Sequence, residues 1–570
     1  MNLTVSNRKR NIVWAILFAA VLALTLWRIN FGYVSHDEAF FITVPDRLVK
    51  GDAFFVDEWQ PTQLTYFITL PFVAIYKNIV GSNDGICLFM RYVYVIAHAA
   101  ISIVIYLRLK KYGIMSVVAS VLYYMFVPGD LMSPGYDSIG VDMIALAGVL
   151  FSTAHESSKS SLLYAISGFA FALAVLCCPY LAAVYVLYFF VVLFYSIKKK
   201  ADELFSWKAF AFITIGIAIP AIAFLIFILS RATVPEILNN FKYLLMDPEH
   251  QDYSFFQKFP RYFSSIILNS AAYFWVVCVL YAMELGLLFF DKKRMEHKSA
   301  YFVVSLLLAV AGLIIFGTDL ISQYFTHIMF PLVMPGFVSY VLLKNKPKGI
   351  FFGLFILGVL YSLCIYTASN QAFFVISMAF SVTNIASWIF IGLLLNEMRA
   401  ETVLKKEKRL VLIAIALCVV AQAGLQTVVK TVHVFRDSSP SQLTEIIDAG
   451  PMKGIKTTEY NRTVYDYTLD DLSIYDEKES GNILILAKQP WYYLATDTQQ
   501  YGTYSACIPG ENEDTLEMLR LYYSENPDKI PNYIYLPKNL SWDYDNLFQL
   551  IDGYGYNISE ENIMSYKFEK

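Results

Sequence analysis

Long apolar runs separated by short polar connections fill the first three quarters of the chain. A helix needs about twenty mostly apolar residues to cross the hydrocarbon of a bilayer. About thirteen runs approach this length, so the pattern predicts a polytopic α-helical membrane protein. The runs lie near residues 12–33, 88–108, 114–128, 138–154, 161–178, 181–197, 209–230, 264–290, 300–317, 325–343, 349–366, 371–395 and 409–429.

Two of the connections are long enough to hold structure of their own. The first, 34–87, contains amphipathic stretches at 38–50 and 60–80, separated by a turn at Gly51. Neither stretch is apolar enough to span the bilayer, so both are predicted to be helices that lie along the membrane interface. The second long connection, 231–263, is polar and aromatic.

The pattern changes again in the last 134 residues, 437–570. Short apolar segments at 482–486 and 533–536 predict buried strands. Residues 511–525 and 544–551 predict helices, the first with acidic residues in its opening turn. Alternating strands and helices favour a small α/β domain outside the membrane, after a transmembrane unit that spans residues 1–430.

Composition excludes a soluble globular enzyme. Of the 570 residues, 57% are apolar and only 16% are charged, whereas about a quarter of an average soluble chain is charged. The net charge of −3 hides a division, because residues 1–436 hold 34 Lys and Arg against 24 Asp and Glu, and residues 437–570 hold 10 against 23. Cysteine spacing predicts neither a disulfide framework nor a zinc site.

Lysine and arginine predict the orientation of the spans, because cytoplasmic loops hold an excess of these residues. Every second connection is basic, which predicts a multi-pass protein of the cell membrane with a cytoplasmic N-terminus and an extracytoplasmic C-terminal domain. Scattered cations without an aromatic platform argue against nucleic-acid binding. The basic groups are Arg8 to Arg10, Lys110 and Lys111, Lys198 to Lys200, Lys292 to Arg294, Lys344 to Lys348, and Lys405 to Arg409.

Most ionisable groups of the bundle's outer rim are acids. They are Asp37, Glu38, Asp57, Glu58, Asp130, Asp137 and Asp319, with His327 nearby. Each is either a solvated loop charge or a member of a convergent site that acts as a base or holds a divalent cation. A carboxylate beside an apolar helix end is unfavourable without a partner, and Asp37 with Glu38 has no Lys or Arg beside it in the sequence.

The first connection resembles that of a known superfamily. It carries an Asp37-Glu38 pair after the first span, then Gly51-Asp52, then the segment Asp57 to Leu64. This order is similar to that of GT-C membrane glycosyltransferases, especially the bacterial protein-mannosyltransferase-like and aminoarabinose-transferase-like branch (glycosyltransferase family 39-like). An Asp at the outer start of the fourth span, Asp137, and the aromatic, Pro-containing stretch 324–335 add to the resemblance.

The resemblance implies an inverting glycosyltransferase that uses a polyprenyl-phosphate-linked sugar donor. The acceptor is a hydroxyl of a protein, a cell-wall polymer or a lipid glycan on the outer face of the membrane. It implies catalytic roles for Asp37 and Glu38, and a Mg²⁺ or Mn²⁺ site at Asp137 and Glu58. Residues implied to contact the donor are Gln60, Gln63, Tyr66, Arg231, Arg261, Tyr324 and His327.

One departure from the family pattern affects the mechanism. Gln60 stands where the family often has Lys, and an amide carries no fixed positive charge. Neutralisation of the donor phosphate is then expected from a metal ion, Arg231, Arg261 or His327.

A transporter or flippase for a lipid-linked precursor is the main alternative. Transporters place ionisable groups in the middle of discontinuous helices and often have two inverted halves. Here mid-span charges look nearly absent, His98 reads as a packing residue, and thirteen spans do not divide equally. The pattern therefore favours the enzyme. A non-catalytic partner in cell-wall export, the third alternative, leaves Asp37 and Glu38 without a purpose.

Overall fold

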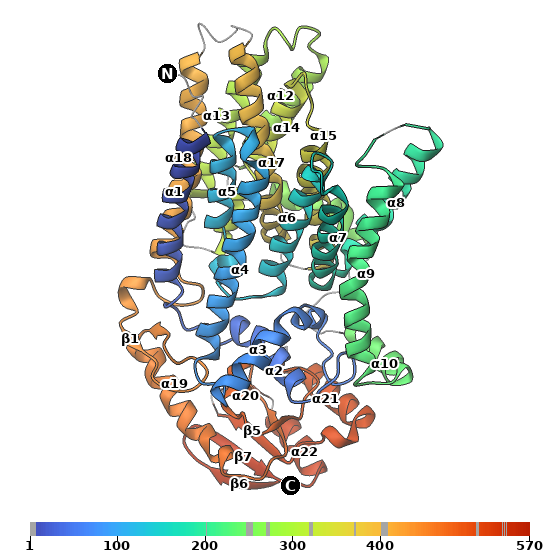
Figure 1. The fold of residues 1–570 in the computed structure, drawn as a ribbon. Coiled ribbons are helices and arrows are strands. Elements are labelled where there is room, and N and C mark those ends of the chain that lie inside the picture. Colours follow the sequence, from blue (N-terminus) through green and yellow to red (C-terminus); the bar gives the residue numbers. More distant parts are fainter. Residues whose placement is uncertain are drawn as a thin grey trace.

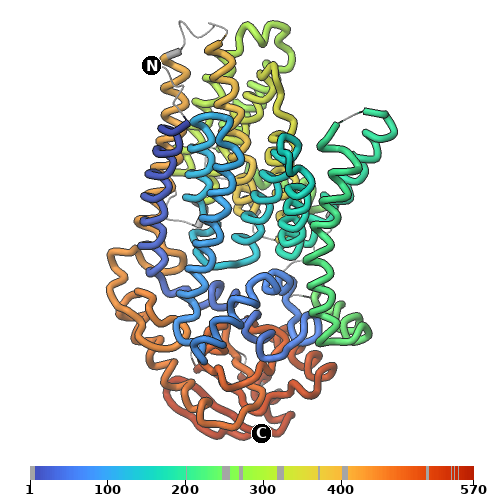
Figure 2. The backbone as a smooth tube through the Cα atoms, in the orientation of Figure 1, coloured from blue at the N-terminus to red at the C-terminus, as the bar shows by residue number. Residues whose placement is uncertain are grey.

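The protein forms two layers, a bundle of long helices and an α/β tail that covers one end of it (Figure 1). The first connection passes between the two layers, as the backbone trace shows (Figure 2). The computed structural model describes residues 7–200, 202–246, 255–268, 274–317, 323–369, 372–400, 408–508, 512–538, 540, 542 and 544–570.

Each of the thirteen predicted apolar runs contains a helix. Ten helices of the described chain are long and apolar enough to cross a membrane, and three more apolar helices are shorter. The protein is therefore a polytopic helical membrane protein. The bundle helices are α1 (Asn7–Arg28), α4 (Ile86–Leu109), α5 (Met115–Met125), α6 (Tyr136–Ala154), α7 (Ser160–Cys177), α8 (Ala182–Ile197), α9 (Trp207–Leu229), α12 (Phe274–Phe290), α13 (Lys298–Gly317), α14 (Val333–Leu342), α15 (Lys348–Ile350), α16 (Leu357–Ala368), α17 (Ala372–Ala400) and α18 (Lys408–Val432).

Small residues bring the bundle helices into close contact, as is common where lipid gives no hydrophobic drive for association. A Cβ atom added at Gly216 of α9 would lie 1.9 Å from the Ala165 carbonyl oxygen of α7, and one at Gly336 of α14 would lie 2.1 Å from Ser387 Oγ of α17. Helix α17 is buried almost along its whole length. It forms the centre of the bundle.

The two helices predicted in the first connection are present as α2 (Asp37–Val49) and α3 (Tyr66–Val80). Their surroundings differ from the prediction. Eleven of the thirteen residues of α2 are buried, because the tail covers the face that was expected to meet the interface (Figure 1). Helix α3 keeps exposed apolar side chains, among them Phe72 and Ile79, and so retains an interfacial character. The second connection holds α10 (Val234–Phe241) and α11 (Phe255–Leu268).

The tail contains the predicted strands β3 (Asn482–Ile485) and β5 (Tyr533–Pro537) and the predicted helices α21 (Glu513–Glu525) and α22 (Tyr544–Gly553). They belong to a five-stranded mixed sheet of order β4-β3-β5-β7-β6, in which β3 is parallel to β4 and β5, and β7 is antiparallel to β5 and β6. The further elements are β1 (Glu445–Ile446), β2 (Lys456–Thr457), α19 (Glu459–Leu472), α20 (Trp491–Ala495), β4 (Gln500–Tyr501), β6 (Asn557–Glu561) and β7 (Ser565–Glu569).

Candidate active site

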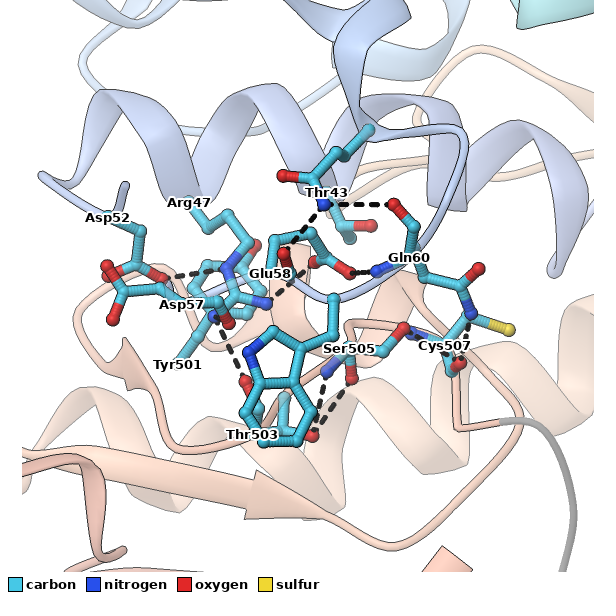
Figure 3. Close-up of polar contacts among 12 residues, drawn as sticks. Thr43, Arg47, Asp52, Asp57, Glu58, Gln60, Tyr501, Thr503, Ser505 and Cys507 are labelled. Atoms are coloured by element: carbon cyan, nitrogen blue, oxygen red, sulfur yellow. Dashed lines mark hydrogen bonds and ion pairs between the residues drawn. The ribbon is translucent and has the colours of Figure 1, made fainter. Parts of the chain in front are cut away.

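Arg47 of α2 joins the first connection to the tail (Figure 3). Its Nε donates to Asp52 Oδ2 at 2.7 Å and its Nη1 to Glu58 Oε2 at 2.7 Å. Nη2 donates to the backbone oxygens of Asp57, at 2.7 Å, and of Thr503 in the tail, at 3.0 Å. The guanidinium is fully buried, and its charge is balanced by two carboxylates. Loop 52–58 and the tail segment around residue 503 are therefore held as one packed unit.

A second ionic group ties the same helix to the tail. Asp46 pairs with Lys77 of α3 at 2.6 Å and accepts a hydrogen bond from the Tyr501 hydroxyl at 2.8 Å. Lys77 also pairs with Asp497 of the tail at 2.5 Å. Burial alone would raise the pKa of Asp46, but Lys50 and Lys77 outweigh it and lower that pKa. The group is ionised, and it fixes α2 between α3 and the tail.

Asp37 begins α2, where the positive end of the helix dipole favours a carboxylate. Its Oδ1 lies 2.9 Å from His36 Nδ1, and its Oδ2 lies 3.3 Å from Arg436 Nη1. Burial would raise the pKa of Asp37, but the His36 hydrogen bond and the charge of Arg436 outweigh it and lower the pKa. A quarter of the side chain is exposed. Asp37 is thus an ionised carboxylate that a small molecule can reach.

Asp137, the first-turn acid of α6, lies close enough to Asp37 for the two carboxylates to interact electrostatically. Gly135 allows this approach, because a Cβ there would meet Phe41 of α2 at 2.3 Å and Asp137 Oδ1 at 2.9 Å. Tyr66 also belongs here: it packs on Phe41, its hydroxyl is buried without an ordinary hydrogen bond, and burial raises its pKa. The structure therefore brings the predicted residues Asp37, Asp137 and Tyr66 together.

Glu38, the other half of the acidic pair, has a different environment. It is fully buried, and its two oxygens each accept a hydrogen bond of 2.6 Å from Arg91 of α4. Arg91 also donates to the backbone oxygens of Ile29, Phe31 and Gly32. This pair fixes the chain between α1 and α2. Its geometry gives Glu38 a positioning role rather than the predicted catalytic one, because neither oxygen is open to a substrate.

We expect Glu38→Gln to lower the free energy of unfolding by about 3–5 kcal/mol, because removing one partner of a buried ion pair leaves the other charge without compensation. Thermal unfolding in detergent measures this. Asp37→Asn is the matched control, since its carboxylate is partly exposed, and it should change stability by less than about 1 kcal/mol. Equal losses in the two variants would contradict the distinction between the neighbouring acids.

One of the predicted binding residues, Gln63, holds the loop together instead. Gln63 is fully buried, and its amide donates to the backbone oxygens of Glu58 and Gln60 and accepts from the Phe55 N–H. Both N–H donors of that amide are used, and its oxygen is buried away from a sugar. Gln60 is partly exposed, and its amide lies 3.5 Å from the Cys507 carbonyl oxygen, so it remains near the site.

The predicted metal site at Asp137 and Glu58 does not fit the geometry. Glu58 is fully buried. Its Oε2 forms an ion pair with Arg47, and its Oε1 accepts a hydrogen bond from the Gln60 N–H at 3.2 Å. Across the described parts of the chain, no three His, Cys, Asp or Glu side chains converge as ligands. Asp137 is therefore close to the like charge of Asp37, and Glu58 is committed to Arg47.

The basic residues predicted to neutralise a phosphate lie elsewhere. Arg231 donates to the backbone oxygens of Leu48 and Asp52 and stacks on Phe227, which ties the end of α9 to the turn after α2. Arg261 lies on an exposed face of α11. His327 is buried against the rings of Phe316 and Phe373, at 5.4 and 4.6 Å. The side chain of Tyr324 and the whole of Asp319 lie outside the described residues.

Arg436, which the sequence analysis missed, is the cation beside Asp37. Its side chain is 54% exposed, stacks on Phe435 with 5.2 Å between the guanidinium carbon and the ring centre, and stands on a left-handed backbone with φ of 52°. It borders a cavity of about 1200 Å³ at the end of α18, lined also by Val432, Ser438 and Tyr460. The missed signal was its position: it comes a few residues after the last span, which ends at Val432, on the predicted outer side, where cations are rare.

Mid-span ionisable groups are more numerous than predicted. His98 of α4 is not a simple packing residue, because its Nδ1 lies 2.7 Å from Asp142 of α6, which also accepts from Tyr123 at 2.6 Å. The other ring nitrogen lies 3.2 Å from the Tyr124 carbonyl oxygen. All of these groups are satisfied. Glu284 of α12 is a further buried acid within the bundle.

The fold and the site together define a polytopic membrane protein whose ionised carboxylate and arginine face each other where the bundle meets an α/β tail. No family model and no curated protein sequence matches the chain. Among solved structures, it is similar to the oligosaccharyltransferase AglB of Archaeoglobus fulgidus, with 12% identity and a TM-score of 0.48 over 92% of this chain and 69% of that one.

It is also similar to ArnT of Cupriavidus metallidurans, with 10% identity and a TM-score of 0.42 over 98% of both chains. The alignment with a structure of that ArnT bound to undecaprenyl phosphate covers 97% of both chains, with 10% identity and a TM-score of 0.39. The roles of individual residues have to be argued from their own contacts.

Proposed function

We propose that the protein is an inverting glycosyltransferase that moves a sugar from a polyprenyl-phosphate-linked donor to an acceptor hydroxyl. The observation that carries the proposal is Asp37, an ionised and reachable carboxylate that touches the half-exposed Arg436. The two residues lie between the bundle and the tail, the level at which the phosphate of a lipid-linked sugar would sit. The topology predicted from the sequence makes this the outer face of the cell membrane.

Asp37 serves as the general base. A sugar that leaves a phosphate passes through an oxocarbenium-like state, and the attacking hydroxyl must lose its proton. Asp37 takes that proton, the acceptor oxygen forms its bond to the anomeric carbon from the face opposite the phosphate, and the bond from that carbon to the phosphate oxygen breaks. Polyprenyl phosphate leaves as an anion. One displacement inverts the anomeric configuration.

Arg436 stabilises the departing phosphate. An exposed ion pair contributes only about 0–1 kcal/mol, so a phosphate can draw the guanidinium away from Asp37. That exchange neutralises the leaving group and opens Asp37 Oδ2 to the acceptor hydroxyl. Arg436 thereby supplies the fixed positive charge that Gln60 lacks. Every step above is carried out by the protein's own residues.

Arg436→Gln should lower kcat/KM for the donor by about 10- to 100-fold, the effect of losing a charge-assisted hydrogen bond to phosphate. Because Arg436 lowers the pKa of Asp37, the variant should also lose activity at a higher pH than the wild type as the solution is acidified. Steady-state kinetics from pH 4.5 to 8 measure both. Arg520→Gln is the matched control, because Arg520 is exposed and also paired with a carboxylate, Glu513 at 2.9 Å.

The direct test is turnover of a radiolabelled polyprenyl-phosphate sugar by the purified protein, with and without EDTA. The expected result is release of polyprenyl phosphate, with label on an acceptor glycan or protein. Failure to consume any of a panel of hexose and pentose donors, in the presence of cell-envelope acceptors, would refute the function. If EDTA abolishes turnover and Mg²⁺ or Mn²⁺ recovers it, the reaction needs the divalent metal predicted from the sequence.

A further inference from the structure

The tail contributes a thiol to the environment of Asp37. Cys507, the one cysteine in residues 437–570, has its Sγ 3.2 Å from His36 Nε2. The opposite nitrogen of the same ring, Nδ1, lies 2.9 Å from Asp37 Oδ1. Cysteine, histidine and aspartate thus form one line of hydrogen-bonded groups, which starts in the tail and ends at the proposed base.

The loop that carries Cys507 is firmly held (Figure 3). Ser505 Oγ donates to the Cys507 carbonyl oxygen at 2.9 Å and accepts from its N–H at 3.1 Å. Thr503 Oγ1 donates to the Ser505 carbonyl oxygen at 2.9 Å, and the Thr503 carbonyl oxygen accepts from Arg47. Cys507 is only 6% exposed. The thiol is therefore fixed against His36 by the same packing that joins the tail to α2.

A thiol that donates to His36 at this place would favour one tautomer of the ring. A neutral imidazole has one N–H and one lone pair. When the Cys507 S–H donates to Nε2, the ring proton must be on Nδ1, where it faces Asp37. If the proton moved to Nε2, the Nδ1 lone pair would face a carboxylate and repel it. The same logic fixes histidine tautomers in other sites through the hydrogen bond made by the second nitrogen.

We propose that Cys507 is a positioning residue for the proposed reaction, which holds the N–H of His36 on Asp37 and keeps this carboxylate ionised and oriented. The inference rests on the proposed function, and it gives the tail a part in the chemistry. The titratable and charged groups that face Asp37 are His36, Arg436, Lys488 and, from α6, Asp137. Of these, His36 is in contact with Cys507.

Cys507→Ala and Cys507→Ser separate this role from simple packing. In Cys507→Ala the His36 ring loses the thiol contact that holds its N–H on Asp37, so the pKa of Asp37 should rise and the acid limb of kcat/KM should move up by as much as about one pH unit. At pH 4.5 that is a loss of at most about 2.5-fold, which disappears by pH 7. Cys507→Ser keeps an O–H donor and should follow the wild type, as should the remote control Cys364→Ala.

An unchanged pH profile in Cys507→Ala, or equal losses at every pH in both substitutions, would overturn the role. The contact itself has a readout that needs no sugar donor. A neighbouring histidine makes a thiol more reactive, so His36→Ala should slow modification of Cys507 by methyl methanethiosulfonate at pH 7 about tenfold. The half-buried Cys278 and Cys364 in the same molecule serve as internal controls, with rates that should not change.

The two readouts separate the inference from the function. Modification of Cys507 that is independent of His36 overturns the inference, even if sugar transfer is observed. Modification that depends on His36, in a wild-type protein that consumes no donor, refutes the function and with it the catalytic role assigned to the thiol. Dependence on His36 together with the shifted pH profile supports both.

Discussion

Asp37→Asn should lower the rate of sugar transfer by about 10²- to 10⁴-fold, the usual contribution of a general base. Asparagine keeps the size of the side chain and can accept a hydrogen bond, but it cannot take the acceptor's proton. Donor binding should survive, because the phosphate is assigned to Arg436. Single-turnover transfer at saturating donor measures the chemical step, and a separate binding titration measures affinity for the donor.

Asp84→Asn is the matched control for this variant. Asp84 belongs to the same connection, is exposed, and pairs with a lysine, Lys453 at 3.7 Å, but it lies away from the contacts of Asp37. Its transfer rate should stay within about twofold of the wild type. Transfer by Asp37→Asn at the wild-type rate would remove the proposed base, whatever else the protein binds.

Arg47→Met should have the largest effect on stability, a loss of about 3–5 kcal/mol. The substitution leaves Asp52 and Glu58 buried without their shared cation, and it also removes the hydrogen bond to Thr503 of the tail. Thermal unfolding and limited proteolysis of the tail measure the two consequences. Arg520→Met, on the tail surface, is the matched control and should stay within about 0.5 kcal/mol. A tail equally resistant to protease in Arg47→Met would contradict the account of how the layers are joined.

Acid should weaken the same junction. Burial raises the pKa of Asp52, but Arg47 and Lys529 outweigh it and lower the folded-state pKa. A carboxyl with a lowered folded pKa stabilises the protein above its unfolded pKa of about 3.9, and that stabilisation is lost as the pH falls through the folded value. Protease sensitivity of the tail should therefore appear below about pH 4, and Asp52→Asn should show it already at pH 7.

Much of the architecture follows from local patterns. Apolar runs predicted the bundle helices, and amphipathic stretches predicted α2 and α3, because a helix is recognisable from neighbouring residues. The burial of α2 could not be read in the same way. Its partners, Thr503 and Tyr501, lie more than 450 residues away in the chain, and only the folded tail brings them to Arg47 and Asp46.

Site residues that belong to a local sequence motif could be predicted. Ion pairs between residues far apart in the sequence could not. The resemblance led to Asp37 and Asp137, which lie together. It also suggested a catalytic role for Glu38, which the ion pair with Arg91 argues against. That pair was not predictable, because Arg91 is 53 positions further along the chain and no local pattern shows such a pair. Arg436 and Cys507 were missed for the same reason, since their distance from Asp37 in the sequence hides their contacts with His36 and Asp37.

One measurement in proteoliposomes tests the central claim, because it compares glycosyl transfer with the main alternative, lipid transport. The purified protein is reconstituted with a polyprenyl-phosphate sugar labelled in both sugar and lipid, and bond cleavage and movement between leaflets are followed in the same sample. We predict cleavage by the wild type, with inverted anomeric configuration in the product, and none by Asp37→Asn. Movement of intact donor across the bilayer without cleavage, equal in both proteins, would contradict the account and identify a flippase.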